Sequence, residues 1–211
     1  MRVETFTFNA FMENTYLLYD ETREAIVIDA GMNSSVENQI FKDYIKENGL
    51  TLKHHLLTHA HVDHVLGSEF LVEEYQVYPM MHKNGIQILD TMEYFVGVYG
   101  LNPTKMILPI GYLSENESIQ FGNSELSILH TPGHAAGSLC FVNKESKFVV
   151  TGDVLFKESI GRTDLPTGNL EVLMHSIKEK LFALDDDFTV YPGHGGFTSI
   201  GYEKSHNPFL I

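Results

Sequence analysis

Residues 58–67 read THAHVDHVLG and place three histidines and one aspartate within six consecutive positions. The segment that leads into them, LKHHLLT, has the composition of a buried strand. In an extended backbone, side chains two positions apart point the same way, so His59 and His61 are placed to bind one metal ion. Asp63 and His64 then face a second position. So many ligand-type side chains in so short a stretch predict a metal site rather than unrelated histidines.

The donor types favour a catalytic metal site over a structural one. Structural zinc sites are closed and often use thiolate, whereas this chain holds a single cysteine, Cys140. Imidazole and carboxylate are the ligands of open zinc or iron sites. One cysteine also makes no internal disulfide, and this suits a reducing compartment, so we expect a cytoplasmic protein.

Further ligands come from three later segments, each of which reads as a strand followed by a turn. ILHTPGH ends at His134, VVTGD ends at Asp153, and TVYPGHGG contains His194. Strand ends converge on one edge of a sheet, and the neighbouring glycines let the backbone turn sharply beside a site. We therefore expect all these side chains to meet.

The order of the elements predicts an α/β fold with two stacked sheets. Each of two blocks of consecutive strands is followed by a helix, so helices would cover both sheets. The expected strands are 3–9, 14–20, 24–30, 52–58, 117–121, 124–130, 138–143, 147–153 and 188–192, and the main expected helices are 34–48, 65–75, 86–92 and 169–183. The aromatic residues of EYFVGVYGLNP (93–103) fit either the core or a pocket wall, and we favour the core.

The composition is that of a soluble globular protein, with 43% hydrophobic and 20% charged residues in 211. No repeat or linker divides the chain, so residues 1–211 are expected to form one domain. The net charge of −14 argues against a nucleic-acid partner. No apolar run approaches the length of a membrane span, and no signal peptide is evident. We expect a small-molecule substrate, and the oligomeric state stays open.

THAHVDH, TPGH, TGD and PGHG occur in this order, and together they resemble the metallo-β-lactamase superfamily, across nearly the whole chain. The resemblance implies an αββα sandwich with metals at one edge. It also implies the ligand assignment: His59, His61 and His134 for a first metal, Asp63, His64 and His194 for a second, and Asp153 as a bridge.

Two divalent cations about 3.5 to 4 Å apart can share a water and lower its pKa into the neutral range. The bridging hydroxide would attack an acyl carbonyl, and Asp63 would be the catalytic residue that orients its proton. Zinc is the expected metal, although iron and manganese also suit these ligands.

Within the superfamily, the segments GDVLFKESIGRTDLP and PGHGGFTSIGYEKSHNPFL are similar to short glyoxalase II-like hydrolases. This predicts a metal-dependent hydrolase of a thioester such as S-lactoylglutathione. Two departures weigh against glutathione as the carrier: the helical domain after the last motif is missing, and Arg162-Thr163-Asp164 replaces a Lys-x-Tyr pair. Arg162 would either bind a substrate carboxylate or pair with Asp164.

Two alternatives stay open. GRTD is also similar to persulfide dioxygenases, which bind a single iron and can retain the second set of ligand residues. A protein of another class, with the same fold and bound metal but no catalysis, is the other alternative. Every ligand position carries a competent residue, and this favours an enzyme.

Overall fold

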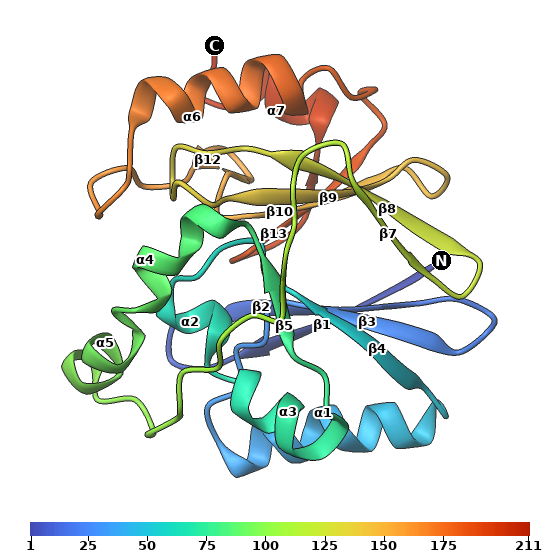
Figure 1. The fold of residues 1–211 in the computed structure, drawn as a ribbon. Coiled ribbons are helices and arrows are strands. Elements are labelled where there is room, and N and C mark those ends of the chain that lie inside the picture. Colours follow the sequence, from blue (N-terminus) through green and yellow to red (C-terminus); the bar gives the residue numbers. More distant parts are fainter.

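The protein is a sandwich of two six-stranded sheets with helices on both outer surfaces, which confirms the predicted fold class (Figure 1). The computed structural model describes all residues from 1 to 211. The layers follow the chain, since α1 (Ser35–Glu47) and α3 (Ser68–Tyr75) cover the first sheet, and α6 (Leu170–Ser176) and α7 (Ile200–His206) cover the second. No helix combines the length and the hydropathy that a membrane crossing requires.

The first sheet is mixed and has its strands in sequence order. Its strands are β1 (Arg2–Phe8), β2 (Glu13–Tyr19), β3 (Glu24–Ile28), β4 (Thr51–Leu56), β5 (Pro79–Met81) and β6 (Gly111–Tyr112). β2 pairs antiparallel with β1 and with β3, whereas the strands from β3 to β6 are parallel to one another.

The second sheet has the order β14-β13-β10-β9-β8-β7, and its one parallel pair is β10 with β13. Its strands are β7 (Ser118–Phe121), β8 (Ser124–His130), β9 (Leu139–Asn143), β10 (Phe148–Gly152), β13 (Thr189–Pro192) and β14 (Thr198–Ser199); the short pair β11 (Leu155–Phe156) and β12 (Ser159–Ile160) stands apart.

The helices pack on the outer faces and around one edge of the sandwich. They are α1 (Ser35–Glu47), α2 (Val62–Val65), α3 (Ser68–Tyr75), α4 (Ile86–Leu89), α5 (Met92–Tyr99), α6 (Leu170–Ser176) and α7 (Ile200–His206), with a short 3₁₀ turn at Lys83–Gly85 and a π-helical turn at Ile177–Leu181 that continues α6. α1 begins where its sequence predicts, because the Ser34 hydroxyl accepts a hydrogen bond from the Glu37 amide and caps the helix.

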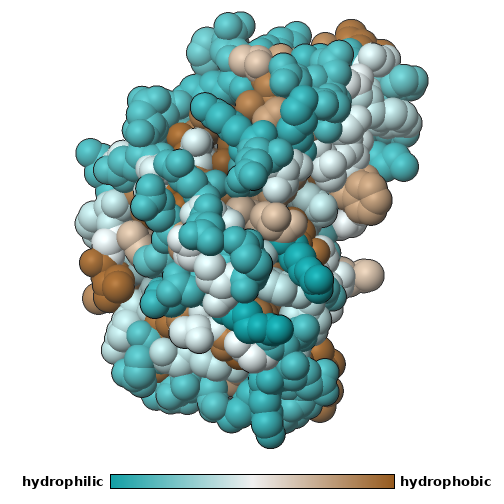
Figure 2. Space-filling model, turned by 90° about the vertical axis from the view of Figure 1, so that its right-hand side faces the viewer, coloured by the Kyte–Doolittle hydropathy of each residue, from teal (hydrophilic) through white to brown (hydrophobic).

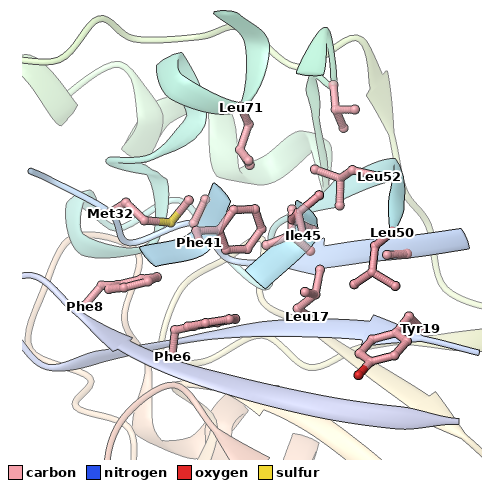
Figure 3. Packing of buried hydrophobic residues seen from close by; sticks show 14 residues of the cluster. Phe6, Phe8, Leu17, Tyr19, Met32, Phe41, Ile45, Leu50, Leu52 and Leu71 are labelled. Atoms are coloured by element: carbon pink, nitrogen blue, oxygen red, sulfur yellow. The ribbon is translucent and has the colours of Figure 1, made fainter. Parts of the chain in front are cut away.

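Alternate side chains along the strands pack against opposite faces of the first sheet. In β2, Tyr16 and Leu18 pack between the sheets, whereas Leu17 and Tyr19 face α1. Successive side chains of a strand point to opposite faces, and both faces are covered, so every residue of β2 is buried. Figure 3 shows the layer under α1, where Phe41 and Ile45 meet Phe6, Leu17 and other side chains.

Three expectations about elements need correction. α7 was not predicted, because GGFTSIGYEKS reads as a glycine-rich loop, yet Ser199 caps a helix whose Ile200 is fully buried. The expected helix 65–75 is divided at Gly67 into α2 and α3. α5 was also not assigned as a helix.

The edge of the sandwich beside α2, α4 and α5 differs from the opposite end. The opposite end, where the hairpins β2–β3 and β7–β8 turn, has a largely hydrophilic surface (Figure 2). At the first edge the sheets are tied together, because the Tyr16 hydroxyl donates to the Pro192 carbonyl (2.6 Å) and the Leu139 amide donates to the Thr58 carbonyl (2.8 Å). The predicted ligand residues lie at this joined edge.

Candidate metal centre

Four segments that end strands bring the predicted site residues together. The loop after β4 and the start of α2 carry His59, His61, Asp63 and His64, and the loops after β8, β10 and β13 carry His134, Asp153 and His194. β10 and β13 are parallel neighbours, and the Gly193 amide donates to the Gly152 carbonyl (2.8 Å). The carboxyl ends of both strands therefore place Asp153 beside His194.

One set of three ring nitrogens faces a common point. The Nε2 atom of His134 lies 2.9 Å from the Nδ1 atom of His61 and 3.2 Å from the Nε2 atom of His59. All three side chains can hold one metal ion. His59 and His134 are buried, and His61 reaches the cavity described below.

A second set lies next to the first. The carboxylate Oδ2 of Asp63 is 3.2 Å from Nε2 of His194 and 3.6 Å from Nε2 of His64, and these three side chains also form a group that can hold an ion. Asp153 lies between the sets, because its Oδ2 is 3.6 Å from Nε2 of both His134 and His194.

The residues present fit bound metal ions. Nε2 of His64 and Oδ1 of Asp153 are buried without a hydrogen-bond partner, 3.5 Å apart. An unsatisfied buried polar atom costs about 1–3 kcal/mol, so such atoms persist where another partner satisfies them. At Gly193, a Cβ atom would lie 2.2 Å from Asp153 Oδ1, so the backbone itself closes the site. The donor set of imidazole and carboxylate suits zinc, iron or manganese.

Hydrogen bonds behind the site fix four of the imidazole rings. Nδ1 of His64 is 2.8 Å from Asp29 Oδ2, and Nδ1 of His59 is 3.0 Å from the Thr58 hydroxyl. Nδ1 of His134 is 2.8 Å from the Arg162 carbonyl, and Nδ1 of His194 is 3.1 Å from the Phe11 carbonyl. A ring that donates through Nδ1 keeps its Nε2 lone pair free to bind a metal.

Asp29 is a functional candidate that the sequence analysis missed. Its Oδ1 accepts a hydrogen bond from the Thr58 amide (2.7 Å), and its Oδ2 accepts hydrogen bonds from the Thr58 hydroxyl (2.7 Å) and from the His64 ring. Asp29 has a positive φ of 53°, which is uncommon outside glycine and costs backbone energy. The signal was present: AIVID ends a buried strand with an acid, as VVTGD does.

Glu13 was also missed, because no motif contains it. Its side chain is fully buried, with Oε2 accepting the Thr15 hydroxyl (2.9 Å) and Oε1 lacking a hydrogen-bond partner 3.9 Å from Nδ1 of His64. Burial raises the pKa of Glu13 well above its usual value.

Burial and charge divide the histidines into two groups. Burial lowers the pKa of His59 and His134, and it lowers the pKa of His61 to about 3. Burial acts in the same direction on His64 and His194, but the neighbouring carboxylates outweigh it and raise the pKa of both rings. The first set is therefore neutral and ready to bind a cation, while the second set is paired with carboxylates.

Gly133 positions His134, and its replacement should destabilise the protein. Its φ is +134°, and a Cβ atom there would lie 2.3 Å from the backbone of Leu173 in α6. We expect Gly133→Ala to lower the free energy of unfolding by about 2 kcal/mol or more, measured by urea denaturation. Gly97→Ala is the control, because Gly97 is helical with no neighbour within 4 Å, and it should be neutral or stabilising. Equal stability of the two variants would contradict this role.

A cavity of about 260 Å³ opens over the centre. His61, Asp63, His134, Asp153 and His194 form its base. The aromatic residues of α5 were expected in the core, but this is wrong for Tyr94, which is exposed, and for Tyr99, which lines the cavity. Phe95 does both, because it lines the cavity and packs partly against the buried cluster that contains Val96. Because of helical periodicity, one face of α5 packs in the core and another lines the cavity.

Arg162 also lines the cavity, but its guanidinium makes a bidentate pair with Asp164. Nε and NH2 donate to the two carboxylate oxygens at 2.7 Å each. Of the two roles expected for this arginine, the structure contains the internal pair.

Comparison with known proteins identifies the family. A model of the metallo-β-lactamase superfamily matches residues 9–194. A protein from Haemophilus influenzae named hydroxyacylglutathione hydrolase GloC is 37% identical over 213 residues, covering 100% of this chain and 98% of the relative. The chain belongs to the metallo-β-lactamase superfamily.

Three solved structures with similar sequences and folds agree with this family. The BLEG-1 B3 metallo-β-lactamase is 30% identical with a TM-score of 0.89, and all of both chains is covered. TTHA1623 in a di-iron-bound form is 34% identical with a TM-score of 0.88, with 99% and 100% coverage. ETHE1 from Myxococcus xanthus is 30% identical with a TM-score of 0.80, covering 99% of this chain and 84% of the other.

Proposed function

We propose that the protein is a metal-dependent hydrolase that cleaves an acyl-thiol ester. The observation that carries the proposal is the pair of adjacent ligand sets, with Asp153 between them, at the base of a cavity. The similarity to a named hydroxyacylglutathione hydrolase over the full chain supports the thioester as the bond.

The chain would hold two divalent cations, with zinc as the proposed metal. His59, His61 and His134 would bind the first, Asp63, His64 and His194 the second, and Asp153 both. Iron remains an alternative, since one similar structure is a di-iron form. When bound, such a pair of cations makes hydroxide available at neutral pH and polarises an acyl carbonyl.

Asp63 is the proposed catalytic carboxylate. Burial alone would raise its pKa, but in the metal-free protein the charges of His64 and His194 outweigh burial and lower the pKa. With metal bound to these rings, the positive charge of the cation would keep the carboxylate ionised instead. Asp63 lines the cavity, and its Oδ2 lies 3.2 Å from Nε2 of His194. An ionised oxygen at this place can accept and orient the proton of the attacking water.

The proposal is tested by hydrolysis of S-lactoylglutathione and of S-acetyl-N-acetylcysteamine by protein whose metal content is measured in the same sample. We expect turnover of at least one thioester. Asp63→Asn should lower kcat/KM by about 100-fold or more. Asp43→Asn, on the exposed surface of α1, should leave it unchanged. Metal-loaded protein that hydrolyses neither thioester would contradict the proposal.

Persulfide oxidation is the second candidate, because ETHE1 is among the similar structures and GRTD is present. Its signature differs from hydrolysis, since it consumes oxygen. Oxygen uptake with glutathione persulfide, in protein that holds a single iron and hydrolyses no thioester, would assign the chain to this reaction.

A further inference from the structure

The wall of the cavity that α5 supplies is aromatic, and its Phe95 also packs partly against the core beneath it. Phe95 and Tyr99 lie one helical turn apart with stacked rings, 5.8 Å between centroids at 17°. Phe11, from the loop between β1 and β2, meets the Tyr99 ring edge-on at 5.1 Å. Tyr99 is half exposed, at 50%, and Phe11 is exposed at 36%.

The buried face of the same helix is formed by other residues. Met92 and Val96 pack into the cluster that contains Leu57, Val65 and Leu89. Met92 and Val96 therefore anchor the helix in the core, and Phe95 packs partly against the same cluster while it lines the cavity. Phe11, Phe95 and Tyr99, which we call the aromatic wall, present apolar surface to the cavity, and an apolar ligand would remove that surface from water.

The rest of the lining adds apolar surface and no free positive charge. Leu165, Pro166 and Thr167 also line the cavity. No lysine lines the cavity, and Arg162, the one arginine there, is paired with Asp164. A carrier with several carboxylates or phosphates would therefore lack side-chain cations to pair with, apart from the metal ions themselves.

We infer that the substrate carries an uncharged apolar group, aryl or alkyl, next to the bond that is cleaved, and that this group packs on the aromatic wall. The inference rests on the proposed function, because it takes this cavity as the substrate site. It names the substrate class: apolar acyl-thiols are preferred over the hydroxyacyl ester of an anionic peptide.

The test measures binding of two stable thioethers of N-acetylcysteamine to the metal-loaded protein by calorimetry. The S-(2-phenylethyl) and S-(2-hydroxypropyl) compounds differ in the group that would meet the wall, and neither has a bond to hydrolyse. We expect the phenylethyl compound to bind about tenfold more tightly. Phe95→Ala should weaken its binding about fivefold or more, and should change binding of the hydroxypropyl compound less than about twofold.

Two further variants keep the result interpretable. Tyr99→Ala removes a half-exposed ring without opening the core, so it folds even if Phe95→Ala does not, and it should weaken phenylethyl binding in the same direction. Val98→Ala alters an exposed residue of α5 outside the cavity and should leave binding unchanged. Equal binding of the two compounds, or the same loss for both in the Phe95 and Tyr99 variants, would overturn the inference.

The corresponding thioesters separate this inference from the proposed function. If the phenylethyl preference is found and depends on the aromatic wall, but neither S-phenylacetyl- nor S-lactoyl-N-acetylcysteamine is hydrolysed, the inference about the cavity stands and the thioesterase fails. If both thioesters are hydrolysed at equal kcat/KM and both thioethers bind equally, the thioesterase stands and the inference fails.

Discussion

Asp153→Ala is expected to lose bound metal and hydrolytic activity together. The Asp153 carboxylate has Oδ2 3.6 Å from a nitrogen of each ligand set and Oδ1 3.5 Å from the third ring, His64. Its removal takes away the shared ligand and the negative charge that would hold two cations close to each other. We expect kcat/KM to fall by on the order of 10³-fold, with less than the full metal content retained by elemental analysis.

Asp187→Ala is the matched control for Asp153. Asp187 is an exposed carboxylate that pairs with Lys147, so its removal should change neither metal content nor activity. An Asp153→Ala protein that keeps two metals and wild-type activity would show that Asp153 does not bridge the sets.

Asp29→Asn is expected to weaken metal binding about 10- to 100-fold, although Asp29 belongs to neither ligand set. Its Oδ2 receives hydrogen bonds from both the His64 ring and the Thr58 hydroxyl, which in turn lies beside the His59 ring. An amide offers one oxygen in place of two, so the donors from Thr58 and His64 are no longer all satisfied. The affinity is measured by competition with a chromophoric chelator.

The choice of asparagine separates this effect from backbone strain. Asp29 adopts a positive φ, and asparagine tolerates that conformation about as well as aspartate. The circular dichroism spectrum should therefore be unchanged. Wild-type metal affinity in a folded Asp29→Asn protein would contradict the positioning role of Asp29.

The sequence predicted the layers and the meeting of the site residues for local reasons. Strands were readable from their β-branched and aromatic residues, and THAHVDH, TPGH, TGD and PGHG each follow a strand, the last three with a glycine where the chain turns. Convergence followed because strand ends meet at one edge of a sheet. The seven proposed ligand positions therefore needed no knowledge of long-range contacts.

The functional residues that the sequence did not predict depend on contacts between distant segments. Asp29 acts on Thr58 and His64 only because β3 and β4 are parallel neighbours, and Glu13 is beneath His64 only because β2 crosses the same edge. The two roles of α5 depend on what lies on each side: Val96 meets the core, whereas Tyr99 meets Phe11, 88 positions earlier in the chain. Composition alone assigns all of these aromatic residues to a core.

The proposed hydrolysis requires that the two ligand sets hold two metals that act together, and a metal titration measures whether they do. Metal-free protein is titrated with zinc while bound metal and hydrolysis of the better of the two thioesters are followed in the same samples. We expect binding to saturate at two equivalents per chain and activity to rise to its maximum only there. Saturation of both binding and activity at one equivalent would contradict the requirement for two metals.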